Sequence, residues 1–395
     1  MIQPEEAVFK YPELFHGQNQ IRYFDFSRIE IYDNDGYYST GICSLCEHWG
    51  TDYYVFSDIG SVKDFEDELS TADLPSQERE NIVHDFNLTR LKIRENNPRA
   101  EERVKILISD CEELNIYCAT PYLMLGIHLA NKKNYSDAYR TFNKIVENYQ
   151  NDPRGWRGLG GVLFYLRRYE EATQAFDKAI VLTEAISKLK DSDKYFHLKL
   201  SIFHETRHLH YLDIIKLNKA ASFFRMGKPK DALIIYEEVY QSKLTNNNLH
   251  PELFIGLSDC FEALEYFENQ ETILWEGIYH FPGNCRLHIE LGQLYFKFAA
   301  LDSALFHYQF VIDREYLDLE AYSEFLLLAK LNGSLSIFYK YVDQAFTIES
   351  ANERDYYYLG HIWFMVGEKK LAKQYYRKSK KFDKPYSKIW KQLLR

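Results

Sequence analysis

Two histidines four residues apart, with a glutamate between them, are the sharpest catalytic pattern in this 395-residue sequence. They are His204, Glu205 and His208. On a helix this spacing puts both imidazoles on one face, where they can share a zinc ion while the glutamate polarises a bound water. A third protein ligand is missing, because Asp213 lies about 140° around the axis from His208 and His197 lies roughly 10 Å along it from His204. A zinc-dependent hydrolase is therefore one alternative, and our own expectation is that the chain holds no metal or cofactor.

Cys43, Cys46 and His48 form a second group of potential metal ligands. One Cys-x2-Cys pair supplies only half of a structural zinc site, and no second pair with suitable spacing follows it. We interpret these cysteines as buried thiols near a strand end. The six cysteines of the chain are too sparse for a disulfide framework, and the first residues lack the basic and apolar parts of a secretory signal. Both features predict a cytoplasmic location.

The composition excludes several classes of protein. Hydrophobic residues make up 46% and charged residues 27%, and no apolar run is long enough for membrane insertion. The net charge of -10 repels phosphate backbones, so we expect no nucleic-acid partner. No glycine-rich phosphate loop, nucleophile elbow or kinase signature is present. The high aromatic content of 16%, with few Gly and Pro, predicts long helices packed through aromatic side chains.

A period of 34 residues runs through most of the chain and must position any functional residue. Small and aromatic residues return at this interval, as in the pairs Gly126 and Gly160, Tyr135 and Tyr169, Ala138 and Ala172, and Phe142 and Phe176. Within each unit the large and small positions are three or four residues apart and share one helix face. The small residue then lets a second helix approach closely. Each unit is therefore predicted to be a helical hairpin.

The pattern resembles the tetratricopeptide repeat family, whose signature combines a Trp-x2-Leu-Gly-x2-Tyr run with an Ala-x3-Phe run. The best matches are Trp156, Leu159, Gly160, Ala172 and Phe176. The resemblance implies an all-α superhelical solenoid of helical hairpins, and it covers about two thirds of the chain.

The remaining segments complete the predicted domain organisation. Residues 1–75 contain aromatic and β-branched runs separated by turn signals, which predict a small β-rich or α+β domain of no recognised family, with a helix or loop at 62–69. The other predicted parts are a capping helical hairpin at 76–118, repeats at 119–186, a helical insert at 187–212, repeats at 213–386 and a cap helix at 387–395.

The resemblance also implies that the first helices of successive repeats line a concave groove. Offsets from the Gly-like position place Gly161, Phe164, Leu217, Ala221, Ile255, Ile289 and Phe364 there, beside the residues that we predict to contact a partner. Those residues are Arg154, Arg157, Tyr165, Phe224, Arg225, Asp259, Glu262, Gln293, Phe296, Lys297, Tyr357 and His361.

The early groove is expected to be basic and aromatic, which predicts a protein or peptide partner with a carboxylate-rich part. Leu123, Ile127, Gly161 and Leu217 occupy positions where chaperone-binding members of the family carry a Lys/Asn clamp, so chaperone C-termini are not the expected ligands. The first hypothesis is a non-enzymatic interaction scaffold. The alternative is a regulatory sensor in which residues 1–75 gate the groove. The sequence leaves the partner's identity, the role of 1–75 and the oligomeric state open.

Overall fold

A computed structural model describes the part of the chain that carries most of the predicted repeats. The described residues are 62–70, 72–94, 97–116, 119–190, 211–246, 249–314, 316, 318–331, 333–348 and 353–379. They contain helices and no strand. The strands predicted in the N-terminal domain, the cysteine group at 43–48, the histidine pair at 204–208 and the cap helix at 387–395 lie outside these residues.

The chain divides into two compact units, each of which is described by itself. One unit spans His48–Tyr266 and the other contains Phe267–Arg395. The boundary falls inside the predicted repeat at 251–284, between its two helices.

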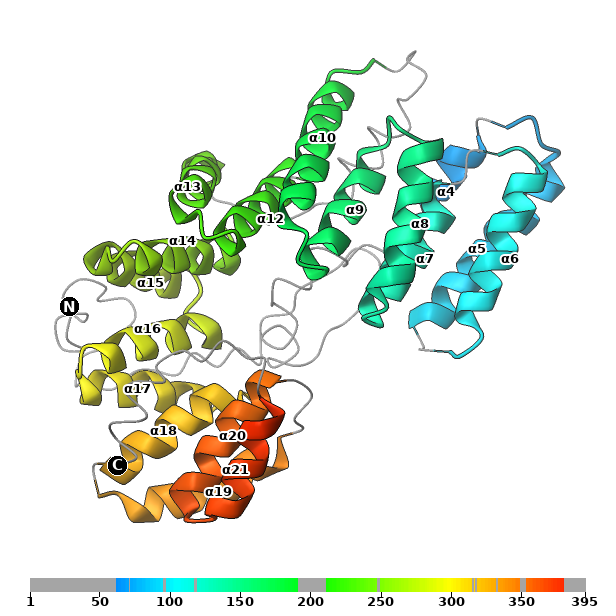
Figure 1. Cartoon of the computed structure of the whole chain (residues 1–395). Helices are drawn as coiled ribbons and strands as arrows, with labels where there is room; N and C mark the ends of the chain where they lie inside the picture. The colour runs from blue at the N-terminus through cyan, green and yellow to red at the C-terminus, as the bar shows by residue number, and fades with distance from the viewer. Residues whose placement is uncertain are drawn as a thin grey trace. The chain divides into compact units, whose positions relative to one another are not determined.

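The first unit is a row of helices in which each helix packs against the next one along the chain (Figure 1). A short helix, α4 (Val62–Leu69), comes first and is followed by the pair α5 (Ser76–Arg94) and α6 (Ala100–Glu113), where the capping hairpin was predicted. The helices of the repeats are α7 (Ala119–Asn131), α8 (Tyr135–Asn148), α9 (Pro153–Tyr165), α10 (Tyr169–Ser187), α12 (Tyr211–Arg225), α13 (Pro229–Asn246) and α14 (Pro251–Ala263).

The second unit continues the same helix spacing. Its helices are α15 (Phe267–His280), α16 (Cys285–Lys297), α17 (Leu301–Ile312), α18 (Leu319–Leu331), α19 (Leu335–Thr347), α20 (Glu353–Val366) and α21 (Lys369–Lys378). Helices α14, α16, α18 and α20 begin at residues 251, 285, 319 and 353, so successive starts are 34 residues apart. The predicted repeat period is therefore the period of the helices, and the prediction of helical hairpins is confirmed.

Capping residues and left-handed turns fix where these helices begin and end. Asp152 and His250 each precede a proline at the first helical position, and each side chain accepts a hydrogen bond from the backbone N–H two residues later. The turn between the two helices of a repeat holds one residue with positive φ at a constant place. These residues are Lys133, Arg167, Gly227, Glu265, Ala299, Gly333 and Gly367.

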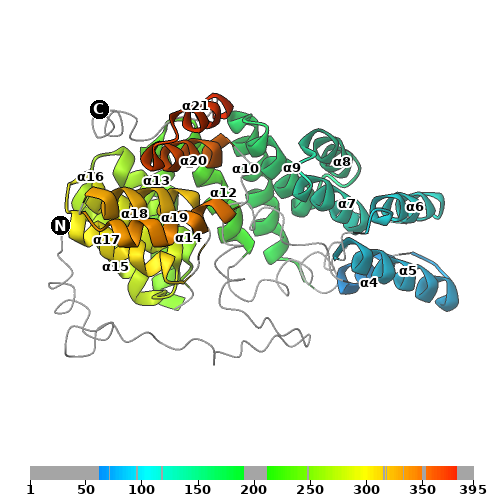
Figure 2. The ribbon, with the colours of Figure 1, turned by 90° about the horizontal axis from the view of Figure 1, so that it is seen from below.

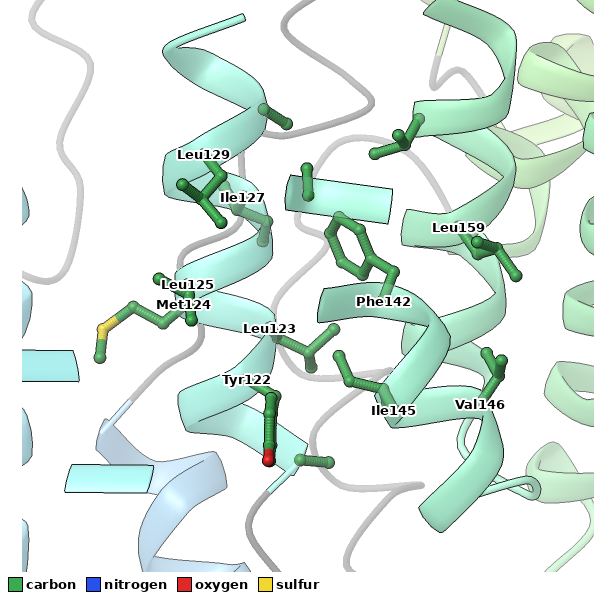
Figure 3. Close-up of a cluster of buried hydrophobic side chains, with 14 of the residues drawn as sticks. Tyr122, Leu123, Met124, Leu125, Ile127, Leu129, Phe142, Ile145, Val146 and Leu159 are labelled. Atoms are coloured by element: carbon green, nitrogen blue, oxygen red, sulfur yellow. The ribbon is translucent and has the colours of Figure 1, made fainter. Parts of the chain in front are cut away.

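Close contact between a glycine and an aromatic ring joins the two helices of a repeat. A Cβ atom added at Gly126 would lie 2.7 Å from the ring of Phe142, and one added at Gly160 would lie 2.7 Å from the ring of Phe176. Figure 3 shows Phe142 surrounded by apolar side chains of α7, α8 and α9. The small residue of the sequence period is therefore needed because a second helix carries an aromatic ring against it.

Helix α4 is attached to the first unit through buried side chains. Phe65 and Leu69 are fully buried, and the Phe65 ring stacks on Phe86 of α5 with centroids 4.4 Å apart. Helix α4 contacts both α5 and α7 (Figure 2). The segment 62–69, predicted to be a helix or loop of the N-terminal domain, is thus a helix, and it packs as part of this helical unit.

Within the described residues, no helix is both long and apolar enough to cross a membrane.

Candidate binding pocket on the first helices

The first helices of three successive repeats border one hollow in the first unit, which we call the α9–α12–α14 pocket. Its empty volume is about 640 Å³, and this volume includes space that is open to solvent. Most of its lining side chains are apolar, and α13 contributes one residue from the second-helix layer. The lining residues are Phe164, Ile214, Leu217, Asn218, Ala221, Phe224, Arg225, Tyr236, Glu252, Ile255, Gly256 and Asp259.

Several residues that the offset rule places in the groove line this pocket. Phe224, Arg225 and Asp259 come from the predicted contact residues, and Phe164 and Leu217 come from the groove positions beside them. Phe164 and Phe224 are half-buried, so each ring presents part of its surface to the hollow. The geometry brings these side chains together, while their contact with a partner stays a prediction.

Sequence reasoning did not identify five of the lining residues, which are Ile214, Asn218, Tyr236, Glu252 and Gly256. The Nδ2 atom of Asn218 is buried, has no hydrogen-bond partner and belongs to a side chain that lines the pocket. Asn218 lies four residues after Ile214 and three before Ala221, and a polar residue on such an apolar face of a predicted first helix is the signal that could have identified it. Tyr236 lies on the second helix α13, which an offset rule restricted to first helices cannot reach.

Two carboxylates and one guanidinium give the pocket rim its charge. Glu252 and Asp259 lie on α14 and are half-buried, and Arg225 lies exposed at the end of α12. The pKa of Tyr236 is raised well above its usual value by burial first, and then by the negative charges of Asp259 and Glu252. His250 stays neutral at pH 7, because burial lowers its pKa to about 3. The charged side chains that line the pocket are therefore two carboxylates and one guanidinium.

Arg154 is already paired with carboxylates of its own chain. Its guanidinium lies 2.7 Å from Glu68 of α4 and 2.7 Å from Asp152, and its side chain is only 9% exposed. Glu68 also accepts hydrogen bonds from the backbone N–H and the hydroxyl of Thr120, the residue equivalent to Arg154 one repeat earlier. A partner that used Arg154 would have to replace these contacts.

Arg157 and Tyr165 are engaged in a similar way. Arg157 is buried, and its guanidinium carbon lies 5.0 Å from the centre of the Tyr211 ring. Tyr165 is half-buried and stacks on Tyr135 with centroids 5.0 Å apart. Glu262 is half-buried and does not line the pocket. Partner contact at these three positions stays a prediction.

The predicted contact residues of the second unit lie in or beside its core. Phe296 is buried, Gln293 is half-buried, and the Lys297 ammonium lies 4.4 Å from the centre of the Phe267 ring. Tyr357 and His361 are both buried, with ring centroids 4.3 Å apart. The structure thus places the second-unit residues in packing contacts, and their partner contact stays a prediction.

The described residues do not bring three His, Cys, Asp or Glu side chains into an arrangement that could hold a metal ion. His204 and His208, the candidate zinc ligands, lie outside those residues, so this finding does not test them. The described cysteines Cys111, Cys260 and Cys285 are buried.

Neither a family model nor a curated protein sequence matches this chain. Among solved structures, it is similar to a tetratricopeptide repeat protein from Parabacteroides merdae, at 12% identity and a TM-score of 0.47, over 80% of this chain and 98% of that one. Its fold is tetratricopeptide-repeat-like. The periodic helix starts and the glycine–aromatic contacts described above carry that statement.

Two further solved structures are also similar to this chain. The type IV pilus biogenesis factor PilW is 15% identical, with a TM-score of 0.43, over 57% of this chain and 91% of that one. A chain of the APC/C hetero-tetramer Cut9-Hcn1 is 13% identical, with a TM-score of 0.47, over 87% of this chain and 61% of that one.

Proposed function

We propose that this chain is a non-enzymatic protein-interaction scaffold that holds an extended segment of a partner protein in the α9–α12–α14 pocket. The observation that carries the proposal is the placement of apolar side chains and a buried amide donor around one hollow on successive first helices. Phe164, Leu217 and Phe224 offer the apolar surface. Burying one large apolar side chain there would supply about 1.5–3 kcal/mol of binding free energy.

Asn218 gives the pocket a means of holding a peptide backbone. Its Nδ2 is a buried donor without a partner, and such a group carries a desolvation cost of about 1–3 kcal/mol. After a rotation of the Asn218 side chain toward the hollow, a backbone carbonyl of an extended segment could accept from this donor and remove that cost. The pocket therefore combines a non-specific backbone contact with a site for one apolar anchor.

Truncation of Phe224 tests this function. The full chain would be affinity-purified from its native cells as the unaltered protein, as Phe224→Ala and as Ile234→Ala, with captured proteins quantified by mass spectrometry. Ile234 is 65% exposed on α13 and does not line the pocket. We expect Phe224→Ala to lose about tenfold of the specific capture and Ile234→Ala to retain it, because a central anchor contributes about 1.4 kcal/mol or more. Equal capture by a folded Phe224→Ala protein would contradict the proposal.

A second candidate function, a regulatory sensor, is supported by the contact of Glu68 with Arg154. Arg154 lies ten residues, about 15 Å along α9, from the pocket residue Phe164. Helix α4 could therefore respond to a ligand of the N-terminal region and change how the first helices receive a partner. Glu68→Gln should alter capture if this coupling exists, and capture identical to that of the unaltered chain would argue against it.

The cytoplasmic location and the zinc-hydrolase alternative also stay predictions. Zinc measured in the purified full chain would decide the second of these. Stoichiometric zinc that is lost in His204→Ala would favour the alternative, and protein without zinc after gentle preparation would remove it.

A further inference from the structure

We infer that the segment held in the α9–α12–α14 pocket carries a large apolar residue flanked by lysine or arginine. This inference rests on the proposed function and specifies the chemistry of the partner at the same site. It differs from the acidic partner that the sequence predicts. The structure supplies three reasons for the difference: the position of the carboxylates, the engagement of the buried arginines and the charge of the chain.

The two carboxylates share the face of α14 that borders the pocket. Glu252, Ile255, Gly256 and Asp259 are spaced as i, i+3, i+4 and i+7, and all four line the hollow. An α-helix places residues at these spacings on one face, with the first and last about 10 Å apart along the axis. An apolar anchor beside Ile255 would therefore have a carboxylate toward each end, within reach of long basic side chains on neighbouring residues of an extended segment.

Most of the arginines that predict an acidic partner are buried. Arg154 is bound by Glu68 and Asp152, and Arg157 is buried against Tyr211. Among the described residues that line the pocket, Arg225 is the one cation, against two carboxylates. Replacing the existing contacts of Arg154 with those of a partner carboxylate would bring no new charge pairing, whereas a basic segment would place its positive charge beside Glu252 and Asp259.

The wider electrostatics agree with this sign. Burial first, and then the charges of Asp259 and Glu252, raise the pKa of Tyr236 on the pocket wall, whereas Arg225 lowers it. The whole chain carries a net charge of -10, which attracts basic segments over distances of about one Debye length.

Selection from a random-peptide library displayed on phage, with the full chain as bait, tests the inference. Unaltered chain and Ile234→Ala should enrich peptides in which an aromatic or aliphatic residue is flanked by Lys or Arg, and Phe224→Ala should not. In one enriched peptide, labelled and measured by fluorescence polarisation, exchanging the basic flank for Glu should weaken binding about three- to tenfold. The double variant Glu252→Gln/Asp259→Asn should abolish this preference, while Glu184→Gln, an exposed carboxylate on α10, should keep it.

The outcomes separate the two proposals. Enriched peptides that need Phe224 but carry acidic or uncharged flanks would overturn the basic-segment inference and leave the interaction scaffold standing. Peptide binding that never depends on Phe224 would overturn both. If the double variant fails to fold, salt provides the second measurement on the unaltered chain. Binding of the basic-flanked peptide should weaken as NaCl rises, and a salt-independent affinity would contradict the inference.

Discussion

At the scale of single residues, one glycine in each of several hairpins lets the two helices approach closely. Added Cβ atoms at Gly160, Gly292 and Gly360 would lie 2.7, 2.9 and 2.6 Å from an aromatic ring sixteen residues later. The sequence period identifies these glycines, and the structure gives the reason for them. In the repeat at 319–352 the equivalent residues are Leu326 and Val342, so the aromatic ring is absent where the glycine is absent.

Gly160→Ala should therefore destabilise the first unit, although alanine is the better helix former. The methyl group must displace the Phe176 ring, and such overpacking costs about 1–3 kcal/mol, against a gain in helix propensity of about 1 kcal/mol. Urea titration would measure the change in the free energy of unfolding. Phe176→Leu should cost less in the Gly160→Ala background than alone, because it makes room for the methyl group. Strictly additive effects would contradict this contact.

A second residue-scale feature is the buried carboxyl of Glu324 in the second unit. Tyr308 donates its hydroxyl to Oε2, while Oε1 is buried and has no hydrogen-bond partner. Burial first, and then the charge of Glu290, raises the pKa of this carboxyl to about 8. The folded protein thus holds Glu324 protonated at neutral pH.

Stability should consequently fall as pH rises from about 4.5, the ordinary pKa of glutamate, through about 8. In that window the unfolded chain has released the proton of Glu324 and the folded chain still holds it. The free energy of unfolding therefore falls by up to about 1.4 kcal/mol for each pH unit. Glu324→Gln, which mimics the protonated form, should flatten this part of a stability–pH curve measured by denaturant titration. An unchanged slope in the variant would contradict a neutral Glu324.

At the scale of elements, the sequence predicts the described helices well and the attachment of α4 poorly. Period, proline and capping residues such as Asp152 place the helices, because these signals are local. The contact between Glu68 and Arg154 joins residues 86 positions apart, and no local pattern reports it. The sequence therefore predicts Arg154 to be a partner contact, whereas the folded chain binds it to its own carboxylates.

Removal of Arg154 should reveal how much this attachment contributes. Arg154→Met leaves the carboxylates of Glu68 and Asp152 buried without their shared cation, which should cost about 3–5 kcal/mol of unfolding free energy. Arg140→Met is the matched control, because its ion pair with Asp137 is exposed and should contribute less than about 1 kcal/mol. Equal losses in the two variants, measured by urea titration, would show that the buried network does not hold α4.

At the scale of the whole molecule, the sequence predicts which side chains share a pocket better than it predicts which charges are accessible there. Helix geometry is periodic, so offsets bring Phe164, Phe224 and Asp259 to one pocket. Charge accessibility depends on packing between distant segments, and the burial of Arg154 and Arg157 is one reason why we propose a basic partner segment. The overall charge of -10 is fully visible in the sequence and agrees with a basic partner segment.

Site-specific photo-crosslinking would show directly what occupies the α9–α12–α14 pocket. A photoreactive phenylalanine analogue would replace Phe224 in the full chain in native cells, and a second protein would carry it at Ile234, which is exposed outside the pocket. Crosslinked peptides would then be mapped by mass spectrometry. We predict that one recurrent partner segment, apolar with a basic flank, is crosslinked to position 224 and is not crosslinked to position 234. Crosslinks to the same segment at both positions, or none at 224, would contradict a partner site in the α9–α12–α14 pocket.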